Sequence, residues 1–210
     1  MHPNPIFRRA PDQLSLDFAR ERGFGLLALN GAASPALAHL PFVLDSQGRQ
    51  ADLHLVRSNP VLALLDEPAE ASLVVSGPDG YVSPDWYGIP DQVPTWNYVA
   101  VHLRGRLERL PREALAGVLD AQSAHAEAQL SPKAPWTAAK MTPGARDKMM
   151  RAIVPCRLHV QTVEGTWKMS QNKPGPAREG AVRGMEAGGG PGLEVGLMAM
   201  MMAADGLREK

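Results

Sequence analysis

The sequence lacks the residues that several common site types require. It has a single cysteine, Cys156, and one thiol can form neither an intramolecular disulfide nor a multi-thiolate zinc site. It also lacks a surplus of either charge, since 22 Lys and Arg residues balance 22 Asp and Glu residues. Binding to a phosphate backbone or an anionic membrane depends on excess cations, so the balance argues against a general basic DNA-binding module.

Long apolar runs are missing as well. The most apolar stretch, LMAMMMAA at residues 197–204, is far shorter than the roughly 18 to 20 residues that cross a bilayer. The start, MHPNPIFRRAPDQ, has prolines and arginines where a signal peptide needs an apolar core. We therefore expect a cytoplasmic protein that does not associate with membranes.

Well-known nucleotide and metal motifs are absent. The sequence contains no GxGxxG after a strand, no Walker loop and no HExxH. Its six histidines do not stand at metal-ligand spacing, and no carboxylate cluster accompanies them. A metal site is therefore not expected.

Compact apolar runs and alternating apolar residues predict strands over most of the chain. Residues 24–29 and 36–44 form an expected hairpin turned at Asn30-Gly31, and residues 51–57 and 71–76 are further expected strands. The longest strand signal covers residues 97–107. There one face is expected to be core and the other polar or interfacial, the core face being Asn97, Val99, Val101, Leu103 and Leu107.

Helices are fewer and lie between these strands. We expect them at residues 11–21, after Asn59-Pro60, at 111–128 and at 143–151. A last hairpin, residues 153–163 and 166–170, is predicted to turn at Glu164-Gly165. Because strands outnumber helices without regular alternation, the predicted fold is mainly β with peripheral helices (α+β), an antiparallel sheet that closes on itself.

The composition changes after residue 173, which predicts two parts: a barrel domain at 1–173 and a Gly/Met-rich extension at 174–210 that is partly helical or flexible. Eight glycines lie between residues 175 and 196, and half of the ten methionines lie beyond Gly184. Glycine at this density is costly to order, so residues 187–192 are expected to form a flexible link. The chain beyond Ala187 is then expected to be dispensable for folding.

The segment HLVRSNP is a candidate anion site. Its strand brings His54 and Arg57 to the strand end, Ser58 and Asn59 add hydrogen-bonding side chains, and a helix beginning at Pro60 offers free backbone N–H groups. A guanidinium beside a helix N-terminus suits a phosphate. The alternative is a capped helix after an edge strand, with the arginine in solvent.

Two further segments could face a planar ligand. In VPTWNY, Trp96 and Tyr98 could form an aromatic wall, while Thr95 and Asn97 could hydrogen-bond a heterocycle, and the aromatic residues of GYVSPDWYG lie nearby in sequence. At the end of the last hairpin, a cation and several polar side chains converge, namely Lys168, Ser170, Gln171 and Asn172. The alternatives are aromatics that plug the barrel end and a solvated strand end.

Together these segments resemble a known family. The elements that carry the resemblance are HLPF at His39, HLVRSNP at His54, GPDGYVSPDWY at Gly77, VPTWNYVAVH at Val93 and RAIV…EGTWKMSQNKP from Arg151 to Pro174. They are similar to the FMN-binding negative transcriptional regulators of the PaiB type, over roughly residues 3–184. The resemblance implies a split β-barrel of the kind shared with pyridoxamine phosphate oxidases and flavin reductases, a homodimer, and FMN held between the two chains.

The resemblance also implies which residues bind the cofactor. It places the FMN phosphate on the segment of His54, Arg57, Ser58 and Asn59. It places the ring system against Thr95, Trp96 and Asn97, with Lys168, Ser170, Gln171 and Asn172 closing the site. No catalytic residue follows from it. The chain beyond Ala187 is expected to be dispensable for flavin binding as well as for folding.

One departure from the family pattern is that Asp79 and Gly80 stand where family members tend to have His-Ala. The expected function is that of an FMN-binding protein of the regulator family, for which the charge balance does not support DNA binding. The alternative is an FMN-dependent oxidoreductase, because enzymes share the same barrel.

Overall fold

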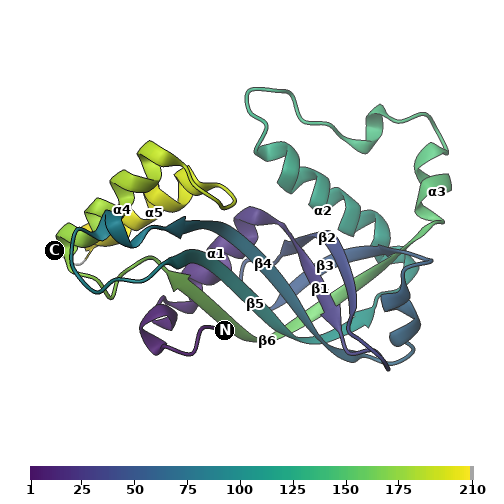
Figure 1. Cartoon of the computed structure of the whole chain (residues 1–210). Coiled ribbons are helices and arrows are strands. Elements are labelled where there is room, and N and C mark those ends of the chain that lie inside the picture. The colour runs from purple at the N-terminus through teal and green to yellow at the C-terminus, as the bar shows by residue number, and fades with distance from the viewer. Residues whose placement is uncertain (209–210) are drawn as a thin grey trace. The chain divides into compact units, whose positions relative to one another are not determined.

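The computed structural model describes residues 1–208, and side chains as far as residue 205. Its strands are β1 (Phe24–Leu29), β2 (Ala36–Leu44), β3 (Gln50–Val56), β4 (Ala69–Val82), β5 (Thr95–Arg109) and β6 (Ile153–Lys168) (Figure 1). Its α-helices are α1 (Asp12–Arg22), α2 (Leu115–Ala128), α3 (Ala145–Met150), α4 (Gly175–Gly188) and α5 (Val195–Arg208). Short 3₁₀ helices are η1 (Pro5–Arg8), η2 (Pro60–Leu64), η3 (Pro84–Tyr87), η4 (Arg112–Ala114) and η5 (Ala138–Lys140).

The strands form a closed barrel in the order β1-β2-β3-β6-β5-β4. Neighbouring strands run antiparallel, as in the β1–β2 hairpin, where Phe24 lies opposite Pro41 and Leu29 opposite Ala36. The expected hairpin and the expected mainly β fold with peripheral helices are confirmed. Closing the sheet leaves no long unpaired strand edge within the barrel.

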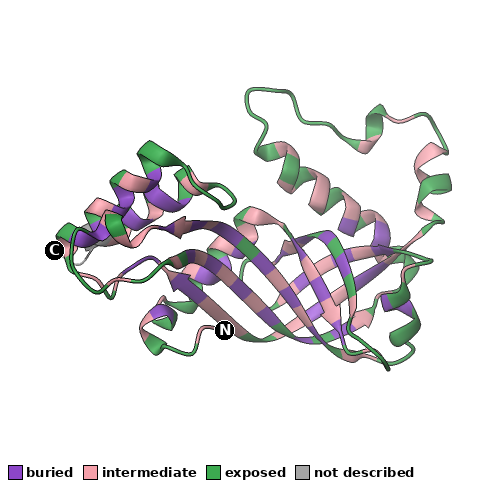
Figure 2. Ribbon diagram, viewed as in Figure 1, coloured by how far each residue is buried: buried purple, intermediate pink, exposed green. Residues whose placement is uncertain are grey.

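Side chains alternate between the barrel interior and its outside, as their burial shows (Figure 2). Along β5 every second residue is buried, including the five that the sequence assigns to the core. Leucines and Phe42 dominate the interior, where the largest fully buried side chains include Phe42, Leu27, Leu53, Leu73, Leu103 and Leu158. This alternation matches the period of two expected for strands with one buried face.

The last strand differs from its prediction. No hairpin turns at Glu164-Gly165, because β6 is one strand from Ile153 to Lys168. Gly165 does not have a positive φ, so it continues the extended backbone. A Glu-Gly pair permits a turn but does not require one, and the residues on either side favour strand.

The chain divides into two compact units. One comprises residues 1–12, 76–101 and 164–210, and the other comprises residues 13–75 and 102–163. Helices α4 and α5 therefore belong to the same unit as the first half of β5. The separate extension at 174–210 stays a prediction.

The link between α4 and α5 is hydrogen-bonded to β4 at Pro191 and Leu193, and the expected flexibility of residues 187–192 stays a prediction. The Asp79 N–H donates to the Leu193 carbonyl and the Tyr81 N–H to the Pro191 carbonyl, each at 2.9 Å. The Leu193 N–H donates in turn to the Asp79 carboxylate at 2.9 Å. Asp79, one of the departures from the family pattern, thus anchors the link to β4.

Candidate functional site

Two predicted segments meet at one end of β5 and β6. The Lys168 ammonium donates to the Thr95 hydroxyl at 2.6 Å. The Asn97 side-chain amide donates to the Ser170 hydroxyl at 2.8 Å, and the Tyr87 hydroxyl lies 2.8 Å from the same Ser170 oxygen. We call these five residues the Asn97 cluster. Four of them were expected in one site, whereas Tyr87 was named only for its aromatic ring.

The amide at the centre of the cluster is buried and only partly satisfied. Asn97 is 0% exposed and Ser170 is 2% exposed. Besides Ser170, the Asn97 Nδ2 contacts the Met202 sulfur of α5 at 3.3 Å. Its Oδ1 has no hydrogen-bond partner among the described residues. A buried acceptor without a donor is costly, so this carbonyl oxygen can bind an N–H or O–H group.

Burial changes the acidity of two groups in the cluster. It lowers the pKa of the Lys168 ammonium below its ordinary value, and the charge of Lys173 lowers that pKa further. Burial raises the pKa of the Tyr87 phenol, an effect that its hydrogen bond with Ser170 opposes. Lys168 is therefore a cation that gives up its proton more readily than a surface lysine does.

The other residues expected at the ring are Trp96, Gln171 and Asn172. They neighbour the Asn97 cluster in sequence and differ in exposure and in hydrogen bonding. Trp96 is 45% exposed and meets Tyr81 edge-on, with ring centroids 6.4 Å apart. The Gln171 side chain is engaged within its own turn, donating to the Trp167 carbonyl and accepting from the Met169 N–H. Asn172 is exposed. Trp96 and Asn172 are accessible to a ligand, while Gln171 shapes the loop.

The remaining aromatic residues of GYVSPDWYG are Trp86 and Tyr87, and both pack against other parts of the chain. Carbon atoms added at Gly184 and Gly180 of α4 would meet the Trp86 ring and backbone at 2.3 Å, so Trp86 packs tightly against that helix. Tyr87 is buried, with Lys173 placed 5.2 Å from its ring centroid. The aromatic density indicates packing with α4, a helix whose position could not be known from the sequence.

The HLVRSNP segment lies beside Arg151. Two cations and two polar residues gather there, which we call the Arg57 cluster: Arg57, Arg151, Ser58 and Asn59. The Arg57 Nε donates to the Arg151 carbonyl at 2.7 Å, so both arginines lie where α3 ends, and both are exposed. The other guanidinium nitrogens of Arg57 have no hydrogen-bond or ion-pair partner among the described residues. Arg151 was not among the residues assigned from the sequence, although it opens the RAIV element.

The expected free N–H groups after Asn59 are not available. Asn59 caps η2, its side chain accepting from the Val61 N–H at 3.0 Å while its carbonyl accepts from the Leu62 N–H at 3.0 Å. Pro60 has no N–H. The cap at Asn59 is confirmed, but η2 is a short 3₁₀ helix whose first donors are already used. Anion binding here must rely on the side chains of Arg57, Ser58 and Arg151.

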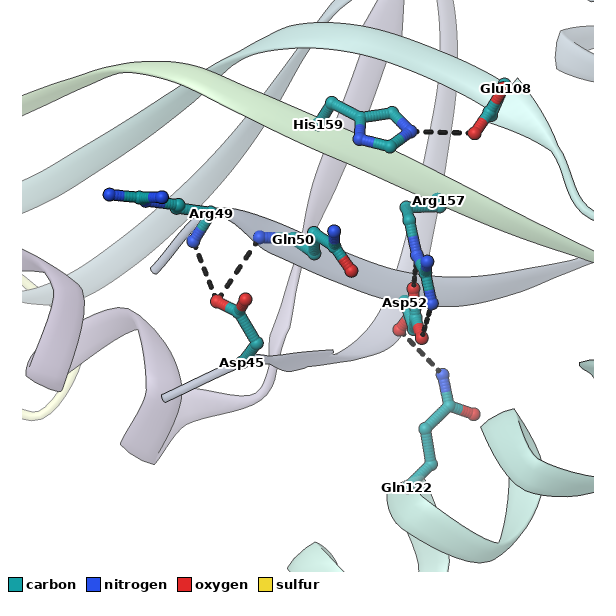
Figure 3. A network of polar contacts seen from close by, with 8 residues as sticks. All are labelled: Asp45, Arg49, Gln50, Asp52, Glu108, Gln122, Arg157 and His159. Atoms are coloured by element: carbon teal, nitrogen blue, oxygen red, sulfur yellow. Dashed lines mark hydrogen bonds and ion pairs between the residues drawn. The ribbon is translucent and has the colours of Figure 1, made fainter. Parts of the chain in front are cut away.

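His54 is held in a defined orientation by α2. Its Nδ1 lies 2.9 Å from the Gln122 Oε1, while the Gln122 Nε2 donates to the Pro41 and Asp52 carbonyls at 3.1 and 3.4 Å. The two carbonyls fix the orientation of the amide, so the neutral imidazole carries its proton on Nδ1 and leaves Nε2 as an acceptor. Figure 3 shows Gln122 beside Asp52, whose carboxylate binds the Arg157 guanidinium at 2.6 and 2.8 Å.

A hollow that the sequence did not indicate lies between α2 and α3. Its volume is about 350 Å³, and its lining includes Leu119, Trp136, Met141, Met149 and the Arg146–Asp120 ion pair. The volume is at the lower end of the range of small-molecule pockets. Trp136 is 39% exposed there.

The single thiol, the possible metal ligands and the apolar helices each have a defined place in the described residues. Burial raises the pKa of the Cys156 thiol to about 12, so it is not a thiolate nucleophile near neutral pH. Residues 1–208 contain no group of three His, Cys, Asp or Glu side chains that could hold a metal ion. No helix in that range is long and apolar enough to cross a membrane.

Each cluster, taken by itself, carries groups that one part of FMN requires. A phosphate needs cationic donors, which the Arg57 cluster supplies. The polar edge of the isoalloxazine needs both a donor and an acceptor, which the buried Asn97 carboxamide has, and its anionic forms are favoured by a cation such as Lys168. The donor set therefore fits the cofactor, which supplies hydride and electron transfer when bound.

Comparisons with known proteins identify the same cofactor. Residues 1–162 match the family described as "Putative FMN-binding domain". The protein "Protease synthase and sporulation protein PAI 2" of Bacillus subtilis is 26% identical over 159 residues, which cover 75% of each chain.

Solved structures share the fold. The FAD and heme binding protein of Mycobacterium smegmatis superposes with a TM-score of 0.53 at 19% identity, over 76% of this chain and 71% of that one. The flavocytochrome Anf3 of Azotobacter vinelandii gives 0.54 at 15% identity, over 80% and 72%. The chain therefore belongs to the PaiB-type FMN-binding family of split-barrel proteins, with FMN as its cofactor.

Proposed function

We propose that this protein is a homodimeric regulator of the PaiB type whose molecular act is to bind FMN. The observation that carries the proposal is the contact between the two motif segments, in which Asn97 donates to Ser170 and Lys168 donates to Thr95. Residues so far apart in sequence, converging on one buried amide and one cation, suit recognition of a polar ring. A regulator then reports flavin occupancy through its own conformation.

Each cluster takes one part of the cofactor in this proposal. Arg57 binds the phosphate through its outer guanidinium nitrogens, with Ser58 and Arg151 assisting. Thr95, Trp96 and Asn97 contact the ring system, and Lys168, Ser170 and Asn172 complete that site. Gln171 acts indirectly by shaping the loop, and His54 contributes the acceptor nitrogen that Gln122 leaves free.

The absorption spectrum of the purified protein tests the proposal. We expect flavin bands in freshly prepared protein, or their appearance after FMN is added and excess is removed by desalting. A spectrum without flavin bands after both steps would contradict FMN binding by this chain.

A dimer is the second expected result. The outward side chains of β5 include part-exposed Tyr98 and Ala100, and Trp96 and Val93 are exposed apolar side chains nearby in sequence. Such a surface suits an interface better than water. Light scattering should give about twice the 22.6 kDa chain mass. A monomer at micromolar concentration would contradict both the dimer and a site shared between chains.

The alternative function is that of an FMN-dependent oxidoreductase, which the lowered pKa of Lys168 favours because such a group can transfer a proton beside the ring. Steady-state oxidation of NADH or NADPH by the FMN-loaded protein would support the enzyme. Salt-dependent retardation of duplex DNA would support direct gene regulation. We expect no such retardation, because the chain has no net cation surplus.

A further inference from the structure

Helix α5 covers the amide that the proposed function assigns to the flavin ring. Met198, Ala199 and Met202 of α5 are each 0% exposed, and the Met202 sulfur is a partner of the Asn97 Nδ2. A thioether is a weak hydrogen-bond acceptor. In this arrangement the Asn97 Nδ2 has one good acceptor, the Ser170 hydroxyl, and one poor acceptor, the Met202 sulfur, while its Oδ1 has no partner among the described residues.

The docked helix therefore combines a favourable and an unfavourable contribution. Burial of two methionine side chains stabilises the docked position. Burial of the Asn97 carboxamide, whose acceptor oxygen receives no hydrogen bond, destabilises the docked position. Methionine is also flexible and tolerates repacking, so these contacts adapt to more than one neighbour.

Helix α5 is also attached at both of its ends, and it packs against α4. The helix is tethered at its start, where Leu193 is bonded to Asp79 of β4. Its far end is joined to α4 by an ion pair between Asp205 and Arg178 at 3.5 Å. On the outward face, Leu197 is 40% and Met200 is 65% exposed, so that face of α5 is not packed within this chain.

We propose that α5 is a displaceable cover over Asn97, and that a ring edge with an N–H beside a C=O takes the place of Met202. A carboxamide presents a donor and an acceptor side by side, and its complement is the edge of a cyclic imide or lactam. The flavin ring has such an edge, so the inference rests on the proposed function and adds the movement that binding requires. Ligand binding then exchanges a sulfur contact for two hydrogen bonds.

Hydrogen exchange on the full-length protein tests the movement directly. We expect saturating FMN to accelerate amide exchange in residues 195–205 at least tenfold, while the amides of α4 are unchanged. Riboflavin should have the same effect on α5, because it carries the same ring. FMN binding with α5 as protected as in the free protein would overturn the proposal and leave the proposed function standing.

Affinity measurements on variants give an independent test. Met202→Ala and Asp205→Asn weaken the docked position, so each should tighten FMN binding at least threefold, by removing part of the cost of opening. Met200→Ala is the matched control on the exposed face and should leave the affinity unchanged. Weaker binding in both docking variants would overturn the cover.

If the wild type binds no FMN, the proposed function fails. Amide exchange in the ligand-free protein then tests whether α5 is a displaceable cover. Its α5 amides must exchange faster than those of α4 if the helix opens. Equal protection of the two helices would overturn the proposal.

Discussion

Replacing Gly105 by alanine should prevent normal closure of the barrel. A carbon atom added at Gly105 of β5 would lie 1.9 Å from the His159 carbonyl oxygen of β6. The carbonyl oxygen belongs to the backbone of β6 and the added carbon is bonded directly to the backbone of β5, so neither can move without disturbing the ladder between the strands. We expect a loss of at least about 4 kcal/mol, in the range of the most damaging single substitutions. This is a large share of the roughly 5 to 15 kcal/mol by which domains are stable.

Thermal unfolding measures this effect. At roughly 2 to 4 °C per kcal/mol for a chain of this size, the melting temperature should fall by about 8 °C or more. Gly117→Ala is the matched control, because nothing lies within 4 Å of a carbon added at that position in α2. Alanine should be neutral or stabilising there, since it is the better helix former. Equal melting temperatures for the two variants would show that the strands tolerate the added atom.

The strands of the barrel were predictable because each is marked locally. Compact apolar runs around a turn signal gave β1 and β2 with the bounds that the structure has, and alternating apolar residues gave the core face of β5 with its five expected residues. Asn59 followed by Pro60 gave the cap of η2. These features depend on neighbours a few residues apart, which is the range over which periodicity and capping act.

Contacts between distant residues were not predictable. The wrong hairpin at Glu164-Gly165 arose because a glycine in a strand looks like a turn until its pairing partner is known. The engaged N–H groups of η2 and the tether at Asp79 depend on local geometry and on a segment over a hundred residues away, respectively. In the same way, Gln122 on α2 orients His54 but has no spacing that links the two.

The candidate site shows the same division. The resemblance named Asn97, Lys168 and Ser170 as neighbours of a ligand, and in the structure Asn97 contacts Ser170 while Lys168 contacts Thr95. It did not indicate that Asn97 lies beneath a methionine-rich helix. A run such as LMAMMMAA shows that a helix has apolar side chains without showing which polar group they cover.

Arg57→Ala should weaken FMN binding by roughly ten- to a hundredfold. Arg57 is exposed at the end of β3, and among the residues that the structure describes only its Nε is engaged, at the Arg151 carbonyl. The first N–H groups of η2 are already bonded and are not available to a phosphate. The guanidinium must therefore supply a larger part of the phosphate binding than it would beside a helix with free N–H groups. Loss of one charge-assisted hydrogen bond costs about 1.5 to 3 kcal/mol, which gives the expected range.

A second arginine, next to the opposite end of β3, serves as the control. It distinguishes a direct contact of Arg57 with the phosphate from a general effect of positive charge. Arg49 precedes β3 and Arg57 follows it, so the two exposed cations stand at opposite ends of one strand. At about 3.3 Å per residue they are roughly 25 Å apart, beyond the Debye length at physiological salt. Arg49→Ala should therefore leave FMN affinity unchanged. Both variants should fold normally, because neither side chain is part of the core.

Riboflavin completes the test, since it has the ring of FMN without the phosphate. Its affinity should be nearly the same in the wild type and in Arg57→Ala, whereas FMN should discriminate between them. Arg57→Lys keeps the charge but loses the planar fork, so FMN should bind it with intermediate affinity. Fluorescence titration of both ligands measures all of these values. If the wild type binds riboflavin as tightly as FMN, or if FMN binds equally to the wild type and Arg57→Ala, the phosphate is held elsewhere, because an arginine that contacts it must contribute to its affinity.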